Sequence, residues 1–186
     1  MIEKLIATVA EQLNKHHIGY MVIGGQAVLV YGRPRLTRDI DITLSIDTDQ
    51  FDRLDAICRD LKLKPLAKEP KEFALQTHVM PVEDIASRIR VDFIFSFTPY
   101  ESAAIHRAKA IQIGGYPVQF ASCEDVIIHK LIAGRAIDDE DIKSIFYKNR
   151  SVIDVQYIAK WLAEFALIPE YKHLPVRWKK LLNDSK

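Results

Sequence analysis

Residues 24–44, GGQAVLVYGRPRLTRDIDITL, contain the pattern that decides the fold class of this chain. Two glycines open the run, and thirteen residues separate them from the Asp-Ile-Asp at 39–41. YMVI, directly before the glycines, has the composition of a short buried strand. QAVLVYG predicts a brief helix that a glycine and a proline end, and the alternation of polar and apolar residues over 37–44 predicts a strand. The run therefore predicts a strand, a glycine turn, a helix and a second strand.

Asp39 and Asp41 carry two carboxylates that a strand would present side by side, because side chains two residues apart in a strand point the same way. Adjacent carboxylates repel each other, and a cation bound between them relieves the repulsion. Mg²⁺ prefers oxygen ligands and keeps coordination positions for substrate phosphates. The pair therefore predicts a Mg²⁺ site, with Ile40 turned toward the core.

Gly24 and Gly25 lack Cβ atoms, so their backbone N–H groups can approach an anion closely. The helix predicted after them has its positive end at the same place, which favours a phosphate. A triphosphate at the glycines would reach a metal ion on the next strand. Taken alone, a glycine pair is usually a tight turn, and Asp-x-Asp is common on solvated strands.

Asp92, in the segment RVDFIF, is an acidic residue on a predicted strand whose other residues belong in a core. Such a residue needs a partner or a function. It could ligand a second metal ion beside Asp39 and Asp41 and accept a proton from an attacking hydroxyl, as in two-metal phosphoryl or nucleotidyl transfer. It could equally form a salt bridge with Arg88 or Arg90. The conjunction of the glycine pair and the three aspartates favours the functional interpretation.

The rest of the chain predicts a mixed α/β sheet with a helical C-terminal third. A single domain over 1–186 is expected, with a core at about 1–121 and a helical part at about 122–186. The predicted elements are a helix over 2–16, a helix over 49–63, a long binding loop over 64–87, a strand over 88–97, a hairpin over 110–121, a helix capped by Ser122 with Asp125, and helices from about 151 that end in a frayed basic tail from 177.

The composition excludes few classes of protein. Lysine and arginine total 26 against 25 for aspartate and glutamate, so the net charge gives no global argument for nucleic-acid binding. Cys58 and Cys123 match no zinc spacing and are expected as reduced, buried thiols. No apolar run is long enough to cross a bilayer and no signal peptide is evident, so a cytoplasmic location without membrane association is expected.

The spacing of Gly-Gly and Asp-Ile-Asp, with Arg-x-Thr-x before the aspartates, resembles the DNA polymerase β-like nucleotidyltransferase superfamily. Within it, GGQAVLVYGRPRLTRDIDI is most similar to the small bacterial nucleotidyltransferases of abortive-infection and toxin–antitoxin systems. The segment 124–142, EDVIIHKLIAGRAIDDEDI, also resembles that group, through a lysine, an arginine five residues later and Asp-x-x-Asp. The resemblance covers residues 20–142 in outline.

This resemblance implies a nucleotidyltransferase fold, a small mixed sheet flanked by helices, and Mg²⁺-dependent transfer of a nucleotidyl group from an NTP, with two ions expected. Gly24 and Gly25 would contact the triphosphate. Asp39 and Asp41 would bind metal, and Asp92 would be the third carboxylate. Many superfamily members have Gly-Ser where this chain has Gly-Gly, so no serine hydroxyl is present at that position.

Lys130 would match the phosphate-contacting lysine of the resembled group, with Asp138 and Asp141 as the later acidic pair. Helical spacing alone places Lys130 at the edge of an apolar stripe, where a lysine usually extends to water. Arg35 and Thr37, between the glycines and the aspartates, could contact phosphates, or could simply be solvated or suit a strand start. Arg135 is spaced to pair with Asp138 or Asp139.

Two classes of function remain open from the sequence. The preferred hypothesis is an enzyme that moves NMP from an NTP to an acceptor hydroxyl on tRNA, a protein or a small molecule. The resemblance also implies a cognate toxin or antitoxin as a partner. The alternative is a catalytically silent nucleotide-binding or antitoxin-like module that acts through a partner protein. Aromatic residues of the C-terminal segment, such as Trp161, Phe165 and Trp178, suit either a dimer face or a core.

Overall fold

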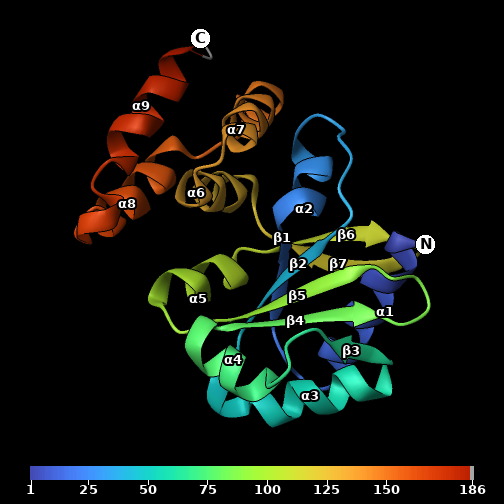
Figure 1. The fold of residues 1–186 in the computed structure, drawn as a ribbon. Coiled ribbons are helices and arrows are strands. Elements are labelled where there is room, and N and C mark those ends of the chain that lie inside the picture. Colours follow the sequence, from blue (N-terminus) through green and yellow to red (C-terminus); the bar gives the residue numbers. More distant parts are fainter. Residues whose placement is uncertain (185–186) are drawn as a thin grey trace. The chain divides into compact units, whose positions relative to one another are not determined.

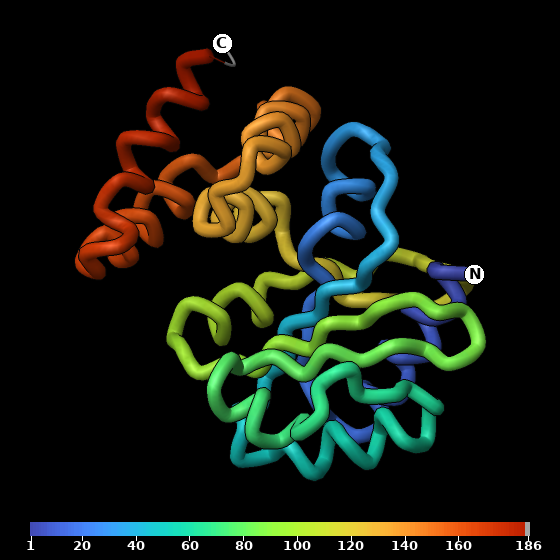
Figure 2. The backbone as a smooth tube through the Cα atoms, in the orientation of Figure 1, coloured from blue at the N-terminus to red at the C-terminus, as the bar shows by residue number. Residues whose placement is uncertain are grey.

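The computed structural model describes residues 1–184 (Figures 1 and 2). The helices are α1 (Ile2–Lys15), α2 (Gly24–Tyr31), α3 (Phe51–Asp60), α4 (Pro70–Thr77), α5 (Pro99–His106), α6 (Cys123–Ala133), α7 (Ala136–Asn149), α8 (Val155–Phe165) and α9 (Leu174–Asp184), with 3-10 turns η1 (Thr48–Gln50) and η2 (Pro169–Tyr171). The strands are β1 (Tyr20–Ile23), β2 (Ile40–Leu44), β3 (Leu63–Pro65), β4 (Val79–Asp84), β5 (Arg90–Phe95), β6 (Lys109–Ile113) and β7 (Tyr116–Phe120).

The described strands form one mixed sheet in the order β3-β4-β5-β2-β1-β7-β6. β2 and β5 are parallel, as are β1 and β7, and the other neighbouring strands are antiparallel. The predicted fold class, a mixed α/β sheet flanked by helices with a helical C-terminal part, is confirmed. The parallel pairing of β2 with β5 matters most for function, because it joins the strand of Asp41 to the strand of Asp92.

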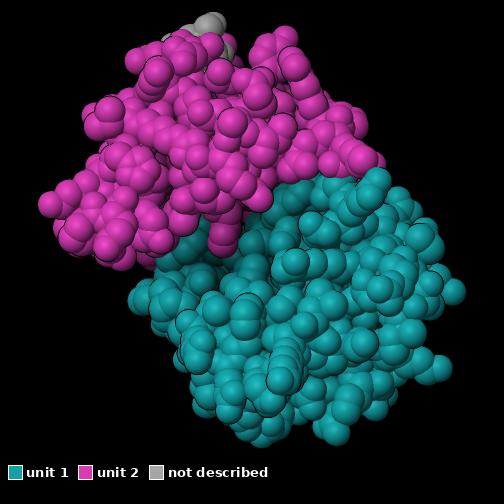
Figure 3. All heavy atoms as spheres, viewed as in Figure 1, with its two compact units in different colours: residues 1–26, 37–121 teal, residues 27–36, 122–186 magenta. Residues whose placement is uncertain are grey.

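The chain divides into two compact units, coloured separately in Figure 3. Unit 1 comprises residues 1–26 and 37–121 and contains the sheet, and unit 2 comprises residues 27–36 and 122–186. The chain passes from unit 1 into unit 2 and back between residues 26 and 37, within and just after α2. A single domain over the whole chain therefore stays a prediction.

Unit 1 has a core in which one face of the sheet is apolar. Val91, Phe93 and Phe95 of β5 are fully buried, whereas the residues that alternate with them are more exposed, as expected for a strand with one buried face. α1 packs its buried stripe, which contains Val9 and Leu13, against β6 and β7. The polar face of β5 is therefore the face that can carry a site.

Unit 2 packs its helices around an apolar centre of its own. α6 contacts α7, α8 and α9, and Leu131, Ile145 and Leu162 are fully buried. Trp178 of α9 is also buried and meets the ring of Phe146 edge-on, with ring centroids 6.1 Å apart. Among residues 1–184, no helix is long and apolar enough to cross a membrane.

The prediction of a long loop over 64–87 is wrong, because the segment begins with the last residues of β3 and also contains α4 and β4. Its prolines suggested irregular backbone, but they occupy positions that tolerate them. Pro70 is the first residue of α4, where its missing N–H costs no helical hydrogen bond. Pro81 lies within β4, and its carbonyl accepts a hydrogen bond from Leu66 N at 2.9 Å.

The basic C-terminal segment is helical as far as Asp184, so the prediction of a frayed tail is wrong for residues 177–184. Leu174, Trp178 and Leu181 recur at helical spacing and are buried, which anchors α9. The last two positions of that prediction, 185–186, lie outside the described residues. The cap at Ser122 is confirmed, since its Oγ accepts a hydrogen bond from Asp125 N at 3.2 Å.

Candidate active site

Asp41 and Asp92 lie directly opposite each other on the parallel strands β2 and β5. Residues in register on neighbouring strands share a face of the sheet and are close in space. Asp39 precedes the first residue of β2, which is shorter than the predicted strand over 37–44. The sheet therefore brings Asp92 to the Asp-Ile-Asp motif, although fifty residues of sequence lie between Asp41 and Asp92.

Gly24 and Gly25 are the first residues of α2, and each makes room for a side chain from the segment that follows the helix. Gly24 has φ +62°, in the region that favours glycine, and a Cβ there would collide with Asp41 Oδ2. A Cβ on Gly25 would collide with Thr37 Oγ1. The sequence analysis explains the two glycines by phosphate binding at their backbone N–H groups. The structure gives a second reason for them, because the side chains of Asp41 and Thr37 approach the glycines closely.

Gln26 is a buried residue that the sequence analysis did not identify. Its Nε2 donates a hydrogen bond to the backbone carbonyl of Asp39 at 3.2 Å. This bond ties the start of α2 to the residue before β2 and helps to fix the position of the first aspartate. The available signal was a polar side chain within an otherwise apolar helix.

Arg90 is the salt-bridge partner of Asp92, with Nε 2.8 Å from Oδ1. This confirms one of the two alternatives, because Arg88 pairs instead with Glu83 at 2.9 Å. The hydrogen bond to Asp92 is the main cause that raises the pKa of Arg90. Burial opposes the shift, and the negative charges of Asp92, Asp39 and Asp41 add to it. The negative charges of all three aspartates therefore contribute to the raised pKa of Arg90, and Asp92 contributes most.

The donor atoms at this place suit a hard divalent cation, since all three side chains offer carboxylate oxygens. The glycine at position 24 lets the Asp41 carboxylate lie against the start of α2, where substrate phosphates were predicted. The chemical type of these donor atoms therefore fits Mg²⁺. In the part of the chain that the structure describes, however, no three His, Cys, Asp or Glu side chains come together closely enough to hold a metal ion.

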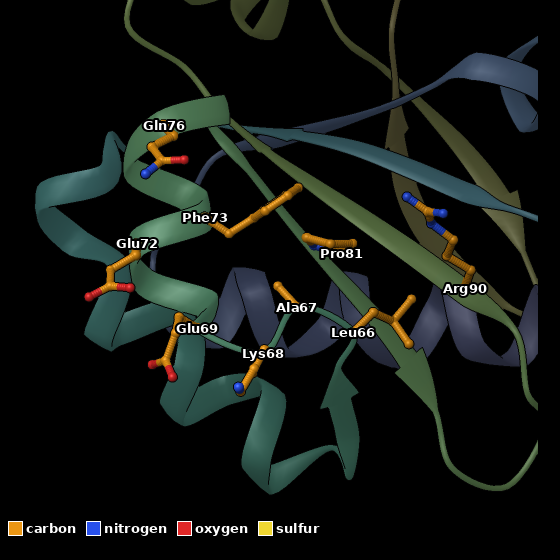
Figure 4. Close-up of a pocket in the computed structure, with 9 residues that line it drawn as sticks. All are labelled: Leu66, Ala67, Lys68, Glu69, Glu72, Phe73, Gln76, Pro81 and Arg90. Carbon is orange, nitrogen blue, oxygen red and sulfur yellow. The ribbon is translucent and has the colours of Figure 1, made fainter.

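A hollow of about 450 Å³ in unit 1 is lined in part by Arg90, the salt-bridge partner of Asp92. It lies between α4 and the strands β4 and β5, and Figure 4 shows Phe73 extending from α4 toward Pro81, with Arg90 on the β5 side. Pro81 is the register partner of Asp92 on β4. Most of the lining comes from the segment 64–87, namely from residues 66–69, from α4 and from β4. Ligand binding by this segment stays a prediction.

Lys130 is buried in unit 2, with a side chain only 3% exposed. Its Nζ lies 2.7 Å from Asp138 Oδ1 and 2.9 Å from Asp141 Oδ2. The expectation that it extends to water is wrong, because two carboxylates from α7 compensate its charge in the interior. Arg135 pairs with Asp138 at 2.9 Å, which confirms one of the two partners expected for it.

Arg35 binds Asp141 through two parallel hydrogen bonds, Nε to Oδ1 at 2.9 Å and Nη2 to Oδ2 at 3.0 Å. The network within unit 2 thus joins the segment after α2 to α6 and α7. Burial alone would raise the pKa of Asp138, but hydrogen bonds from Arg135 and Lys130 outweigh it and hold that pKa below its usual value. Contacts of Arg35, Lys130 and Asp141 with phosphates stay predictions.

Comparison with solved structures identifies the class of fold. The chain resembles the solution structure of the antibiotic-resistance factor ANT(2'')-Ia (TM-score 0.62, 17% identity, 92% of this chain and 96% of that chain covered). It resembles the crystal structure of the same factor with adenylyl-2''-tobramycin (0.58, 16%, 96% and 97%). It also resembles an antigenic nucleotidyltransferase-like protein from Paracoccidioides brasiliensis (0.58, 15%, 93% and 91%). At these identities the likeness establishes a nucleotidyltransferase fold.

The sequence itself identifies the family. Residues 11–178 match the model of the nucleotidyl transferase AbiEii toxin family, of type IV toxin–antitoxin systems. The chain belongs to this family, and it is accordingly a nucleotidyltransferase, as the motifs at 24–41 and 124–142 predicted. A search of curated protein sequences found no match.

Replacing Gly24 with alanine is expected to lower the rate of nucleotidyl transfer about 100-fold, because the new Cβ forces the Asp41 carboxylate to rotate out of place. The positive φ adds a strain of about 1–2 kcal/mol to the folded state. Gly114→Ala is the matched control, since Gly114 has φ +58° but its nearest neighbouring atom would lie at 3.8 Å. Thermal unfolding should show similar destabilisation in both variants, and transfer assays should show a defect in Gly24→Ala alone. Equal activity of the two would refute a requirement for this close approach.

Proposed function

We propose that this chain transfers NMP from an NTP to an acceptor hydroxyl with Mg²⁺, and that it does so as the toxin enzyme of a toxin–antitoxin pair. The observation that carries the proposal is the register of Asp41 with Asp92 beside Gly24. A pure nucleotide-binding module has no need of three acidic side chains in one place, because their mutual repulsion is costly. The family match supports the transferase and a cognate antitoxin as its partner.

The roles of the side chains follow from the chemistry of nucleotidyl transfer. The acceptor oxygen forms a bond to the α-phosphorus while the bond from that phosphorus to pyrophosphate breaks, and the acceptor proton passes to a carboxylate. We assign this proton to Asp92, and we assign the binding of Mg²⁺ to Asp39 and Asp41. When bound, Mg²⁺ supplies positive charge that polarises the phosphoryl group. Backbone N–H groups at Gly24 and Gly25 hold the phosphates at the start of α2.

From the strand order we also infer the side of the site from which the acceptor approaches. In an in-line displacement, the attacking and leaving oxygens lie on opposite sides of the phosphorus. β1 leads into the glycines, β2 and β5 carry the carboxylates, and β4 follows on the far side. A triphosphate at the glycines therefore leaves the acceptor on the β4 side, where the hollow at Phe73 and Pro81 lies.

The acceptor itself can belong to any of three chemical groups that present a hydroxyl: tRNA, a protein or a small molecule. The similar structure of ANT(2'')-Ia is a complex with adenylyl-2''-tobramycin, an antibiotic that carries an adenylyl group. The lining of the hollow, which combines the apolar Phe73 and Leu66 with charged Glu69, Glu72 and Arg90, suits an acceptor with both apolar and polar groups. Each group of acceptors therefore needs its own assay.

The proposal is tested by incubating the protein with each of the four NTPs labelled at the α-phosphate, with Mg²⁺ or with a chelator. Total RNA, cell protein and a small-molecule extract are offered separately. We expect label on one acceptor class, dependent on Mg²⁺ and lost in the double variant Asp39→Ala/Asp41→Ala. Tight binding of Mg-NTP without transfer to any acceptor would refute the enzymatic proposal and favour the binding module.

A further inference from the structure

Arg90 is a permanent cation beside Asp92, which with Asp39 and Asp41 forms the proposed carboxylate cluster. It lies two residues before Asp92 on β5, so both side chains emerge from the same face of the strand. Its Nε meets Asp92 Oδ1 at 2.8 Å, and arginine remains charged at every physiological pH. The third carboxylate is thus already compensated by the protein itself.

The charges at the cluster favour a single metal ion. Asp39, Asp41 and Asp92 together carry three negative charges when ionised. One divalent cation and one guanidinium supply three positive charges and balance them. Two divalent cations with Arg90 would leave an excess of two positive charges before any nucleotide binds, which opposes binding of the second ion.

We propose that Arg90 supplies, at Asp92, the positive charge that a second metal ion would otherwise supply, so that the nucleotide-free enzyme binds one divalent cation and not two. This inference rests on the proposed function and concerns the nucleotide-free enzyme only. Asp39 and Asp41 bind the single ion, and Arg90 orients the carboxylate of Asp92 toward the acceptor side.

A second metal ion can compete with Arg90 for Asp92, because the Arg90–Asp92 ion pair is not fully buried. The side chain of Arg90 is 50% exposed and that of Asp92 is 18% exposed. Arg90 also lines the hollow at Phe73, so it can leave Asp92 without disturbing the core (Figure 4). A second ion therefore competes with Arg90 and binds more weakly, and removal of Arg90 lifts the competition.

The test counts Mn²⁺ ions bound to the full-length, nucleotide-free protein, by the electron paramagnetic resonance signal of the unbound ion. Wild type is expected to bind one ion, and Arg90→Gln two. The dissociation constant of the second ion should fall at least about fivefold in Arg90→Gln, the ratio that a partly exposed ion pair of about 1 kcal/mol gives. Arg90→Lys keeps the charge and should keep a single ion.

Arg88→Gln is the matched control, because it removes the same charge two residues away from a side chain that is 74% exposed and paired with Glu83. It should bind one ion, as wild type does. Two ions on wild type, or only one on Arg90→Gln, would overturn the inference while leaving the proposed function intact. No Mn²⁺ bound to any variant, with wild type identical to Asp39→Ala/Asp41→Ala, would overturn the proposed metal site and the inference together.

Discussion

Replacing Asp41 with asparagine is expected to reduce the rate of nucleotidyl transfer by at least about 1000-fold, which corresponds to about 4 kcal/mol of lost transition-state stabilisation. The amide has nearly the same shape as the carboxylate but carries no charge. It therefore binds a hard cation poorly and leaves Asp39 as the only charged member of the motif. The measurement is the rate of label transfer at saturating NTP.

The fold should tolerate this change. An isosteric substitution at a partly exposed position alters the free energy of unfolding by less than about 1 kcal/mol. Removing one of three like charges also relieves repulsion in the cluster. Asp52→Asn is the control in the same unit, since Asp52 is 79% exposed and pairs only at the surface with Lys71. An Asp41→Asn protein that transfers label at the wild-type rate would exclude Asp41 from the metal site.

Much of this site could be predicted because its local patterns are strong. The glycine pair and the Asp-Ile-Asp lie within one short run, and side-chain direction along a strand follows from its period of two residues. The prediction that Asp92 lies close to Asp39 and Asp41 had a weaker basis, because the local sequence of neither β2 nor β5 predicts that these two strands pair. Only the sheet order makes Asp41 and Asp92 register partners. Local sequence therefore indicates the candidate residues, while long-range strand pairing decides whether they lie close together.

The burial of Lys130 could not be inferred from helical spacing. Spacing gives the face of α6 on which the residue lies, but it does not show that two carboxylates of α7 lie opposite. Without knowledge of those partners, a lysine beside apolar residues is expected to extend to water. The ion pairs with Asp138 and Asp141 depend on the packing of α6 against α7, which is a tertiary contact.

The helix α5 was missed for a different reason, because its signal was present in the sequence. Thr98 and Glu101 form a capping box, and Pro99 occupies the first turn of α5. The helix contains only eight residues and lacks a clear apolar stripe, since Tyr100 and Ala104 are its only buried residues. A search for periodicity alone overlooks so short a helix, whereas a search for caps would have found it.

Replacing Lys130 with methionine is expected to lower the free energy of unfolding by roughly 3 kcal/mol, the lower end of the cost of breaking a buried ion pair. The change leaves Asp138 and Asp141 buried with less compensation, although Arg135 and Arg35 still pair with them. Urea unfolding at neutral pH measures the loss. Lys143→Met, which removes an exposed pair with Glu140 at 3.6 Å, should cost less than about 0.5 kcal/mol.

The deficit of Lys130→Met should also depend on pH in a defined direction. The pKa of Asp138 is held below its usual value, with Lys130 among the causes, so its stabilising contribution is present at neutral pH. That contribution is lost as the pH falls below about 4, through the ordinary value for aspartate and then the depressed value in the folded state. The difference between wild type and Lys130→Met should therefore narrow in acid. A deficit that does not change with pH would contradict the assigned role of the ion pair.

The same variant separates the structural role of Lys130 from the phosphate contact predicted for it. At a temperature at which both proteins remain folded, a lysine that only joins α6 to α7 can be lost with little change in the Michaelis constant for NTP. Loss of a lysine that also contacts the triphosphate raises the Michaelis constant, because an ion pair with phosphate contributes to substrate binding. We expect the stability to fall in either case. A Michaelis constant at least about tenfold higher, in a folded Lys130→Met protein, would therefore show that the buried network leaves Lys130 able to reach the nucleotide.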